Sequence, residues 1–368
     1  MLRILTIIFS FFSLTFFASQ TAYAQQPIEP KETVLKAEVV EIIKESERTI
    51  VDKTYPVQEV KIKLLDGHQK DTVITIKHGE LTTIRDEQKV QAGQTIVIRK
   101  IETDQTSYQI IDQYRLDRLY PIIVFFIILV LAISRWKGLG SLIGLGISLV
   151  IILQFIVPSI LNGQDPLLTS IVGSCVIMLV TMYLAHGINT RTHIALAAIC
   201  ISLLLTGILS YLFVNLTFLT GLGSDDATSL SYGPTGSINF QGLLLGGIII
   251  GTLGVLDDIA SSLTASIQEL AKANPKLHFK DLWQGGMRIG SEHIASLVNT
   301  LALAYAGAGL PLFLFIVLNP ADQPIWLLLN SEMLVEEIIR TLAGSIGLIL
   351  AMPITAALAS MTFQHKTK

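Results

Sequence analysis

Charged residues are scarce over most of this chain. Residues 25–118 hold 15 of its 26 Lys and Arg and 17 of its 29 Asp and Glu, and the 250 residues that follow are almost continuously apolar. An ionised side chain in hydrocarbon is costly and usually faces a partner or a water-filled path. The charges that remain in the apolar part therefore need an explanation. They form three short clusters: Asp257-Asp258, Arg288 with Glu292-His293, and Glu336-Glu337 with Arg340.

Cysteine, basic runs and catalytic motifs are also nearly absent. The only cysteines, Cys175 and Cys200, lie in apolar runs, where we interpret them as small buried hydrophobic residues. No basic run suggests a nucleic-acid partner. The sequence has no G-x-S-x-G, no H-E-x-x-H and no P-loop. The adjacent Asp257 and Asp258 point in different directions on a helix, so they do not supply the aspartate pair of an intramembrane protease. We therefore expect neither an enzyme nor a resident cofactor.

The N-terminus has the three parts of a secretory signal. Arg3 supplies the positive charge, residues 4–17 the apolar core, and Ala22-Tyr23-Ala24 a cleavage site. We predict a cleaved signal peptide over residues 1–24, with an uncleaved anchor as the alternative. In both cases the domain that follows lies outside the cytoplasm.

Residues 25–113 have the pattern of a small extracytoplasmic β domain. Val60, Ile62 and Leu64 alternate with lysines, which is typical of a half-buried strand. Further strands are expected over residues 33–43, 73–77 and 95–98, with turns at residues 66–67 and 92–94. Five short strands suit a small barrel or sandwich, such as an OB-like barrel. His68 and His78 are single and lie beside turn residues, so we expect both on the surface.

Residues 114–368 predict a polytopic helical membrane domain. Its hydropathy indicates seven spans, at residues 119–134, 139–161, 166–185, 194–219, 238–263, 289–318 and 340–362. With the β domain outside, the predicted cytoplasmic segments hold nine Lys and Arg and the outer loops after the first span hold only Arg340. This positive-inside bias agrees with an odd number of spans and a cytoplasmic C-terminus.

Two segments interrupt the regular pattern of spans. Residues 307–311 place Gly, Ala, Gly, Leu and Pro near the middle of the sixth span. A broken helix of the kind that exposes backbone to a transported solute and a simple kink both explain this segment. Residues 327–339 are amphipathic and predict an interfacial or re-entrant helix on the outer side.

Polar residues form a stripe on each of the fifth and sixth spans. Asp258, Ser261, Ser262, Ser266 and Glu269 share one helical face, and Arg288, Ser291, Glu292, Ser296 and Asn299 repeat the same spacing. Neither stripe can face lipid cheaply, so we expect the two to meet. The predicted path comprises Asp257, Asp258, Ser261, Ser262, Arg288, Ser291, Glu292, His293, Ser296, Asn299, Thr300, Glu336, Glu337 and Arg340.

Several kinds of chemistry fit these stripes. A buried pair of carboxylates such as Asp258 and Glu292 can carry a proton or coordinate a cation. Arg288 could instead neutralise one of them, and His293 would add a ligand for a divalent metal. The structural alternative is that these side chains cap helix ends and form an ion pair at the cytoplasmic interface.

The apolar part of the chain contains a set of short motifs: Thr220-Gly221-Leu222-Gly223, Gly242-Leu243-Leu244-Leu245, Gly251-Thr252-Leu253-Gly254, Gly286-Met287-Arg288-Ile289-Gly290, residues 299–305, Asn330-Ser331-Glu332, Gly344-Ser345-Ile346-Gly347 and Pro353-Ile354-Thr355. Through these motifs the chain resembles the YibE/F family of bacterial membrane proteins over roughly residues 95–362. That family's pattern has a single acidic residue at Asp257-Asp258 and an Asp at Glu292, which favours Asp258 as the functional aspartate. The resemblance implies a multi-pass plasma-membrane protein of the kind described as a permease, and it implies no substrate.

Two functions follow as hypotheses. The first is a secondary transporter or permease with a carboxylate-lined path between the fifth and sixth spans, coupled to a proton or another cation. The second is a membrane scaffold without transport activity, whose β domain binds a partner in the cell envelope.

Overall fold

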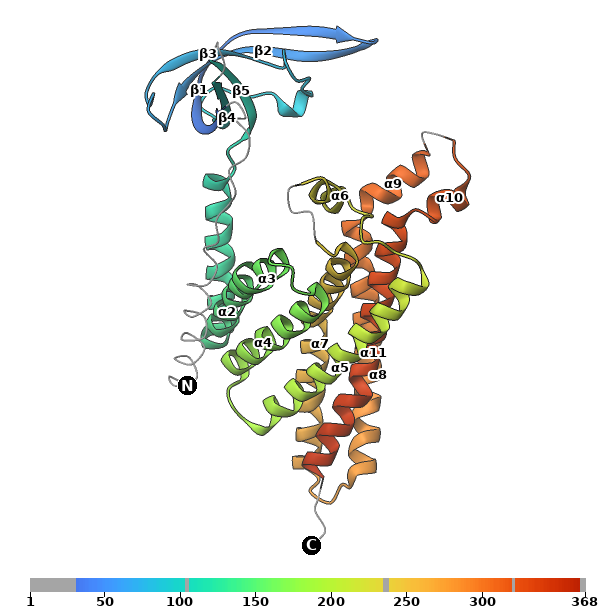
Figure 1. Ribbon diagram of the computed structural model, residues 1–368. Helices are drawn as coiled ribbons and strands as arrows, with labels where there is room; N and C mark the ends of the chain where they lie inside the picture. The colour runs from blue at the N-terminus through green and yellow to red at the C-terminus, as the bar shows by residue number, and fades with distance from the viewer. Residues whose placement is uncertain (1–30, 103–105, 234–237, 320–321, 365–368) are drawn as a thin grey trace. The chain divides into compact units, whose positions relative to one another are not determined.

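The computed structural model describes residues 31–102, 106–233, 238–319 and 322–364. The predicted signal peptide therefore lies outside the described residues. After Leu129 the chain divides into two compact units, which are described separately below. One unit contains a five-stranded β domain and the other a bundle of helices (Figure 1). The predicted fold class, a small all-β domain followed by a polytopic helical domain, is confirmed.

The β domain is one antiparallel sheet with the strand order β3-β2-β1-β4-β5. The central strand β1 pairs with both β2 and β4. The two edge strands, β3 and β5, contact each other, so the sheet curls into a partly open barrel. Its OB-like type stays a prediction. The strands are β1 (Lys31–Ile50), β2 (Lys53–Leu64), β3 (Val73–His78), β4 (Thr95–Glu102) and β5 (Ser107–Gln113), with a 3-10 turn η1 (Asp86–Gln88) before β4.

The core of the β domain follows the strand alternation that the sequence predicts. Val60, Ile62 and Leu64 of β2 are fully buried, and Ile96 and Ile98 of β4 lie in the same cluster. The lysines between them face outward or lie at the rim. The domain therefore has a hydrophobic core of its own, formed by side chains of its strands and of the segment before β4.

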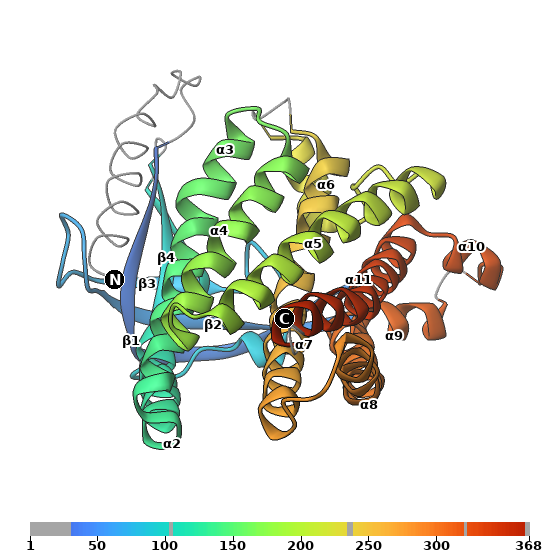
Figure 2. The same ribbon diagram turned by 90° about the horizontal axis from the view of Figure 1, so that it is seen from below.

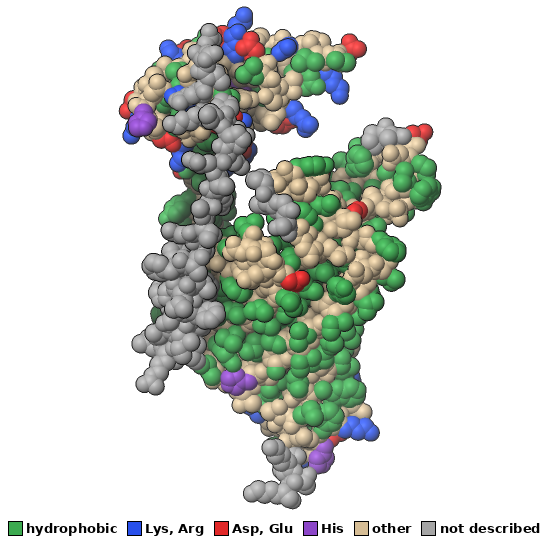
Figure 3. Space-filling model, in the orientation of Figure 1, with side chains coloured by type: hydrophobic (Ala, Val, Ile, Leu, Met, Phe, Trp, Pro, Cys, Tyr) green, Lys and Arg blue, Asp and Glu red, His purple; other side chains and the backbone are tan. Residues whose placement is uncertain are grey.

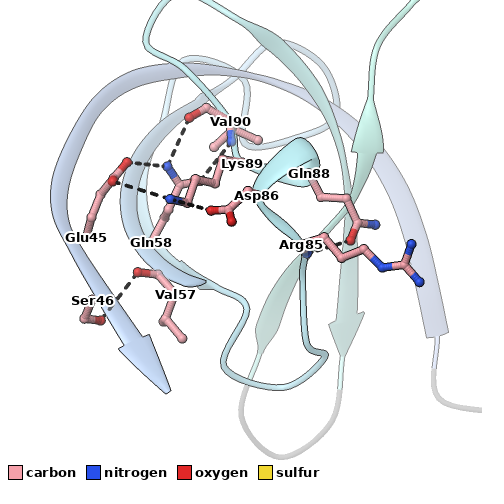
Figure 4. A network of polar contacts seen from close by, with 9 residues as sticks. All are labelled: Glu45, Ser46, Val57, Gln58, Arg85, Asp86, Gln88, Lys89 and Val90. Atoms are coloured by element: carbon pink, nitrogen blue, oxygen red, sulfur yellow. Dashed lines mark hydrogen bonds and ion pairs between the residues drawn. The ribbon is translucent and has the colours of Figure 1, made fainter. Parts of the chain in front are cut away.

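A buried glutamine holds the segment before β4 against the sheet. Gln58 of β2 is only 1% exposed. Its Nε2 donates to Glu45 Oε1 at 2.8 Å and to the Val90 carbonyl at 3.2 Å, and its Oε1 accepts from the Val90 amide at 2.8 Å (Figure 4). Lys89 pairs with Asp86 at 2.9 Å, close to this network. One side chain thus links β1, β2 and the residues that lead into β4.

His78 differs from its sequence-based expectation. Its side chain is buried, with Nε2 lying 3.1 Å from the Gln88 carbonyl oxygen, whereas His68 is exposed as predicted. A carbonyl oxygen only accepts, so Nε2 carries the hydrogen. Burial lowers the pKa of His78, and the hydrogen bond to Gln88 opposes this effect. The turn after β3 folds back over the histidine, an arrangement that a local sequence pattern does not reveal.

The helical unit consists mainly of long apolar helices, and its visible face is largely hydrophobic (Figure 3). Arg135 has non-helical angles, so α2 is two helices joined at a kink. The helices are α2 (Leu116–Ile151), the π-helical turn η2 (Ile152–Ile156), α3 (Val157–Leu161), α4 (Pro166–His186), α5 (Thr190–Leu216), α6 (Asp225–Ser231), α7 (Phe240–Ala273), α8 (Phe279–Ala308), α9 (Leu310–Leu318), α10 (Ile325–Leu329) and α11 (Glu332–Phe363).

Among the described residues, six helical segments are long and apolar enough to cross a membrane: Leu116–Trp136 and Gly138–Leu161, which the kink in α2 separates, and helices α4, α5, α7 and α11. The bent pair α8–α9 makes a seventh span when it is counted as one. Their order agrees with the seven spans expected from hydropathy. Several helices are longer than their predicted spans: α7 continues to Ala273, α8 begins at Phe279 and α11 begins at Glu332. Hydropathy marks only the apolar part of a helix, and amphipathic turns extend it further.

Helix α7 is packed on several sides, because it contacts α4, α5, α8 and α11. Leu256 and Ile259 of α7 are fully buried in the main core of the bundle. Gly242 and Gly246 lie against Pro166 and Ser170 of α4, so this glycine pair lets the two helices pack closely.

The structure tests two expectations about irregular segments, residues 307–311 and 327–339. The glycine-rich segment breaks the sixth span at Gly309, where α8 and α9 meet at an angle of 63°. The expected amphipathic helix over residues 327–339 is wrong in its boundaries. Its first part is the short α10, and its second part forms the first turns of α11, because the chain leaves helical geometry at Asn330-Ser331. Glu336 and Glu337 thus belong to a spanning helix.

The Gln58 network predicts a measurable loss of stability on truncation. Gln58→Ala leaves the buried amide and carbonyl of Val90 without this partner, so the free energy of unfolding should fall by about 1–3 kcal/mol. Urea unfolding of an isolated segment of residues 31–113 measures it. The matched control is Gln91→Ala, whose side chain is exposed. Equal stability of the two variants would contradict the structural role of Gln58.

Candidate functional site

Two carboxylates of α11 hold a loop from a distant part of the chain. Glu332 Oε1 accepts from the Thr220 amide at 2.6 Å, the Thr220 hydroxyl at 2.7 Å and the Gly221 amide at 3.0 Å. One turn later, Glu336 accepts from the Gly223 amide at 2.9 Å. We call this set, residues 220–223 with Glu332 and Glu336, the carboxylate clamp. Charge-assisted bonds to backbone amides are stronger than neutral ones, so the clamp fixes this loop to α11.

The glycines of the clamp are required by its geometry. Gly221 has a φ of +84°, and a Cβ there would collide with the Phe240 carbonyl at the start of α7. A Cβ on Gly223 would lie 2.7 Å from the Glu336 carboxyl carbon. The loop therefore approaches both α7 and α11 more closely than a residue with a side chain permits.

Arg340 lies one turn beyond Glu336 on α11. Its Nε is 3.4 Å from Glu337 Oε1 but forms no hydrogen bond within the described residues, although this atom is shielded from solvent. Gly247 and Gly251 of α7 provide the space on the opposite side. A Cβ at Gly247 would lie 3.2 Å from Arg340 Nη1, and one at Gly251 would lie 2.9 Å from the Tyr305 hydroxyl of α8. This second glycine pair accommodates polar side chains instead of another helix backbone.

A cavity of about 300 Å³ lies between the clamp and α7. Glu336, which is 5% exposed, and Arg340 supply its charged groups. Its remaining walls are mostly apolar and come from η2, α3 and α7, with Gly221 and Ser224 from the loop. An apolar cavity with a few convergent polar groups is the usual form of a small-molecule site. Here one carboxylate and one guanidinium could orient a small polar or charged solute.

The polar stripe of α7 is largely satisfied within its own helix. The Ser261 hydroxyl donates to Asp257 Oδ1 at 2.9 Å, and the Ser262 hydroxyl donates to the Asp258 carbonyl at 2.6 Å. The Asp258 side chain is exposed, whereas Asp257 is partly buried. Asp257 and Asp258 thus face different surroundings, as the sequence predicts.

The polar stripe of α8 does not meet that of α7. Arg288, Ser291, Glu292, His293, Ser296, Asn299 and Thr300 are all exposed. The helix buries its other side, where Gly286 lies against Ile267 of α7 and Gly290 against Met352 of α11. The expectation that the two stripes pack together within one copy of the chain is therefore wrong. The glycines bring the opposite face of α8 closer to the bundle, and this leaves the polar face outside.

No three His, Cys, Asp or Glu side chains in the described part of the chain form a group that could hold a metal ion. Asp258, Glu292 and His293 do not make the divalent-metal site considered from the sequence. Of the residues expected in the path, Glu336 and Arg340 line one cavity, and Glu337 pairs with Arg340. The others are distributed over α7 and the outer face of α8.

A family model for YibE/F-like proteins matches residues 122–365. The chain belongs to the YibE/F-like family. The match covers nearly all of the helical unit and begins after the β domain, so the β domain is not part of what defines this membership. No curated protein and no solved structure matches the chain. Two of the motifs that carry the resemblance, Thr220-Gly221-Leu222-Gly223 and Asn330-Ser331-Glu332, meet in space as parts of the carboxylate clamp.

Sequence reasoning missed Thr220, Tyr305 and Glu332 as parts of this site. Glu332, Glu336 and Arg340 recur at intervals of four residues, which places them on one face of a helix. This spacing could have indicated the shared face from the sequence. The amphipathic helix was expected to end at residue 339, so Arg340 was assigned to a different helix from Glu332 and Glu336.

The clamp predicts that two glycines with similar angles respond differently to substitution. Gly221→Ala should destabilise the helical unit severely, because its Cβ meets backbone atoms of Phe240. Gly163 has a φ of +82° and nothing within 4 Å, so Gly163→Ala should cost only about 1–2 kcal/mol for the left-handed conformation. Thermal unfolding of the detergent-solubilised protein compares the two. Similar melting temperatures for both variants would contradict the close approach at Gly221.

Proposed function

We propose that the protein is a secondary transporter, or permease, for a small polar or charged solute. The observation that carries this proposal is the cavity lined by Glu336 and Arg340 within a bundle of membrane-spanning helices. Charged residues in such helices are costly and typically mark a substrate or ion pathway. Among the described residues, the buried Arg340 Nε lacks a hydrogen-bond acceptor, and a bound solute or water would supply one.

The break between α8 and α9 supports a transport function. Transporters use interrupted helices to expose backbone groups at membrane depth and to allow one part of the bundle to move. Here the break at Gly309 follows Tyr305, whose hydroxyl lies against Gly251 of α7, one turn beyond Gly247 and Arg340. A change in the angle between α8 and α9 would therefore act on α7 at Gly251, next to Ile250 in the wall of the cavity.

Coupling to a proton or another cation is proposed for Asp258 and Glu292. Both are carboxylates of spanning helices, and neither forms an ion pair within the described residues. A carboxylate near the membrane interior can bind and release a proton as its access to water changes. These residues lie along α7 and α8 beyond the cavity, so the proposal separates the solute site from the coupling groups.

The proposed setting is the plasma membrane of a bacterium. The excess of Lys and Arg in the predicted cytoplasmic segments favours an extracytoplasmic β domain and a cytoplasmic C-terminus. In this orientation the carboxylate clamp and its cavity lie toward the outer side. No chemical transformation is part of the proposal.

A second candidate function is that of a scaffold whose β domain binds an envelope partner. A groove of about 300 Å³ favours it, because the groove is lined by side chains of β3, β5 and the segment between β3 and β4. Expression of the β domain on an unrelated membrane anchor distinguishes the two functions. Rescue of a deletion phenotype by this fusion would support the scaffold, and the transporter requires that it rescue nothing.

Substitutions at the cavity should abolish solute movement. Arg340→Gln and Glu336→Gln each remove a charged group of the cavity, and we expect at least about a tenfold fall in uptake, as one charge-assisted contact accounts for this much. Right-side-out vesicles offered a mixture of small charged and polar solutes, analysed by mass spectrometry against vesicles without the protein, provide the measurement. Asp225→Asn is the control, since Asp225 is exposed beside the cavity. Unchanged uptake in both cavity variants would reject this site.

Neutralising the proposed coupling groups should stop the accumulation of solute against its gradient without stopping its downhill movement. Asp258→Asn and Glu292→Gln should each abolish accumulation driven by a proton gradient at an unchanged protein level, while downhill movement of the solute persists. Uptake with and without an imposed gradient measures the difference. Glu269→Gln is the control, because Glu269 is exposed near the end of α7 and pairs with Lys272. Full gradient-driven accumulation in both variants would end the coupling proposal.

A further inference from the structure

Helix α8 has two opposite faces. Gly286, Gly290 and Leu301 are buried against the bundle, whereas Arg288, Glu292 and Asn299 are exposed on the other side. Figure 2 shows α8 at the side of the bundle, next to α7 and α11. The exposed face belongs to the bent α8–α9 pair that is apolar and long enough to cross the membrane. In a bilayer this face would meet lipid.

Polar side chains on this face of α8 need polar partners in a membrane. Within the described residues, Arg288 and Glu292 form no ion pair, and the hydroxyls of Ser291 and Thr300 donate only to carbonyls of α8 itself. Glu292 lies inside the predicted sixth span, residues 289–318, where an unpaired carboxylate is costly, and Arg288 lies at the cytoplasmic boundary of that span. The first span, Leu116–Trp136, carries Arg135 at its cytoplasmic end but no carboxylate there, so it offers no partner for Arg288. The partner must present a carboxylate within one turn of Arg288 and a cation within one turn of Glu292.

The exposed face also has the spacing of a helix–helix seam. The exposed Arg288, Glu292, Ala295 and Asn299 follow one another at intervals of four and three, as in a heptad repeat. The half-buried Ala302 and Ala306 continue the same spacing. The alanines allow two helix backbones to approach closely, and polar side chains such as Asn hydrogen-bond across helices in membranes. An asparagine within such a seam also selects the register and the number of helices.

A second copy of the chain meets both requirements. Two copies inserted in the same direction bring their α8 helices together in parallel around a twofold axis, so each surface contacts the same surface of its partner. Arg288 then lies one turn from Glu292 of the other copy, and the reverse pair forms by symmetry. We propose that the polar face of α8 is the contact between two copies of this protein.

This contact goes beyond the proposed transport function and does not depend on it. Pairing places Glu292, Ser296 and Asn299 inside protein instead of lipid. The polar stripe of α8, which is exposed in one copy, then becomes an enclosed polar zone at the centre of a dimer. The coupling group Glu292 would be complete only with the second copy present.

A pair of cysteine variants tests the contact in native membranes. In a background with Cys175→Ala and Cys200→Ala, Ala302→Cys lies on the seam and Ala304→Cys lies about 200° round the same helix at nearly the same depth. We expect rapid disulfide cross-linking to a dimer at position 302 and at least fivefold less at position 304. Equal cross-linking at both positions, or none at position 302, would overturn the proposal.

Charge reversal tests the pairing independently of cysteine. Arg288→Glu and Glu292→Arg should each lower the dimer association constant by about tenfold, which is within the range of polar contacts between membrane helices. The double variant should recover most of the loss, because opposite charges again face each other. Single-molecule photobleaching in vesicles counts the copies, and it requires no transported solute. A dimer fraction that stays unchanged in both single variants, or a double variant no better than either, would overturn the pairing. A failure of transport alone leaves these measurements unaffected.

Discussion

The cost of leaving a charge or an unpaired polar group in hydrocarbon governs the arrangement of the helical unit. Glu332 and Glu336 begin α11 and would face this cost, but backbone amides of residues 220–223 surround them. The same bonds join the segment after α5 to the start of α11, more than 100 residues apart in sequence. One pair of carboxylates thus closes the end of the bundle where α7 also begins, and it forms one side of the cavity.

Different forces pack the β domain and the helical unit. In the β domain, the hydrophobic effect places apolar side chains of alternate strand positions in one core. One buried glutamine, Gln58, connects three segments through three hydrogen bonds. In the helical unit, lipid is as apolar as the helix surfaces, so packing depends on small residues and on polar contacts. Gly246 against Ser170 and Gly347 against Thr206 are examples of such close contacts. Glycine is therefore concentrated in the helical unit for packing as well as for turns.

Local patterns were enough to predict most of the elements. Strand alternation around Ile62, the long apolar runs and the break near Gly309 depend on neighbours within one turn or strand, and each is present in the structure. The carboxylate clamp could not be located in this way, because its partners are distant in sequence and its donors are backbone amides without a side-chain signature. The error about α8 has a related cause. Periodicity identifies which residues share a face, but it does not show whether that face lies toward the bundle, and Gly286 and Gly290 on the opposite face proved the better packing surface.

Helices α7 and α8 connect the cavity with the proposed coupling groups. Along α7, Gly247 and Gly251 face Arg340 and Tyr305, and Asp258 follows seven residues later, about 10 Å along the axis. Along α8, Tyr305 and His293 are twelve residues apart, so one helix contributes to both regions. Glycines at Gly286 and Gly290 give α8 a smooth surface against α7 and α11, which favours small sliding movements over separation. A shift of α8 would then change the contact of Tyr305 with α7 at Gly251, one turn from Gly247 in the wall of the cavity. Because α8 also carries the seam for a second copy, pairing would limit this movement to what both copies can share.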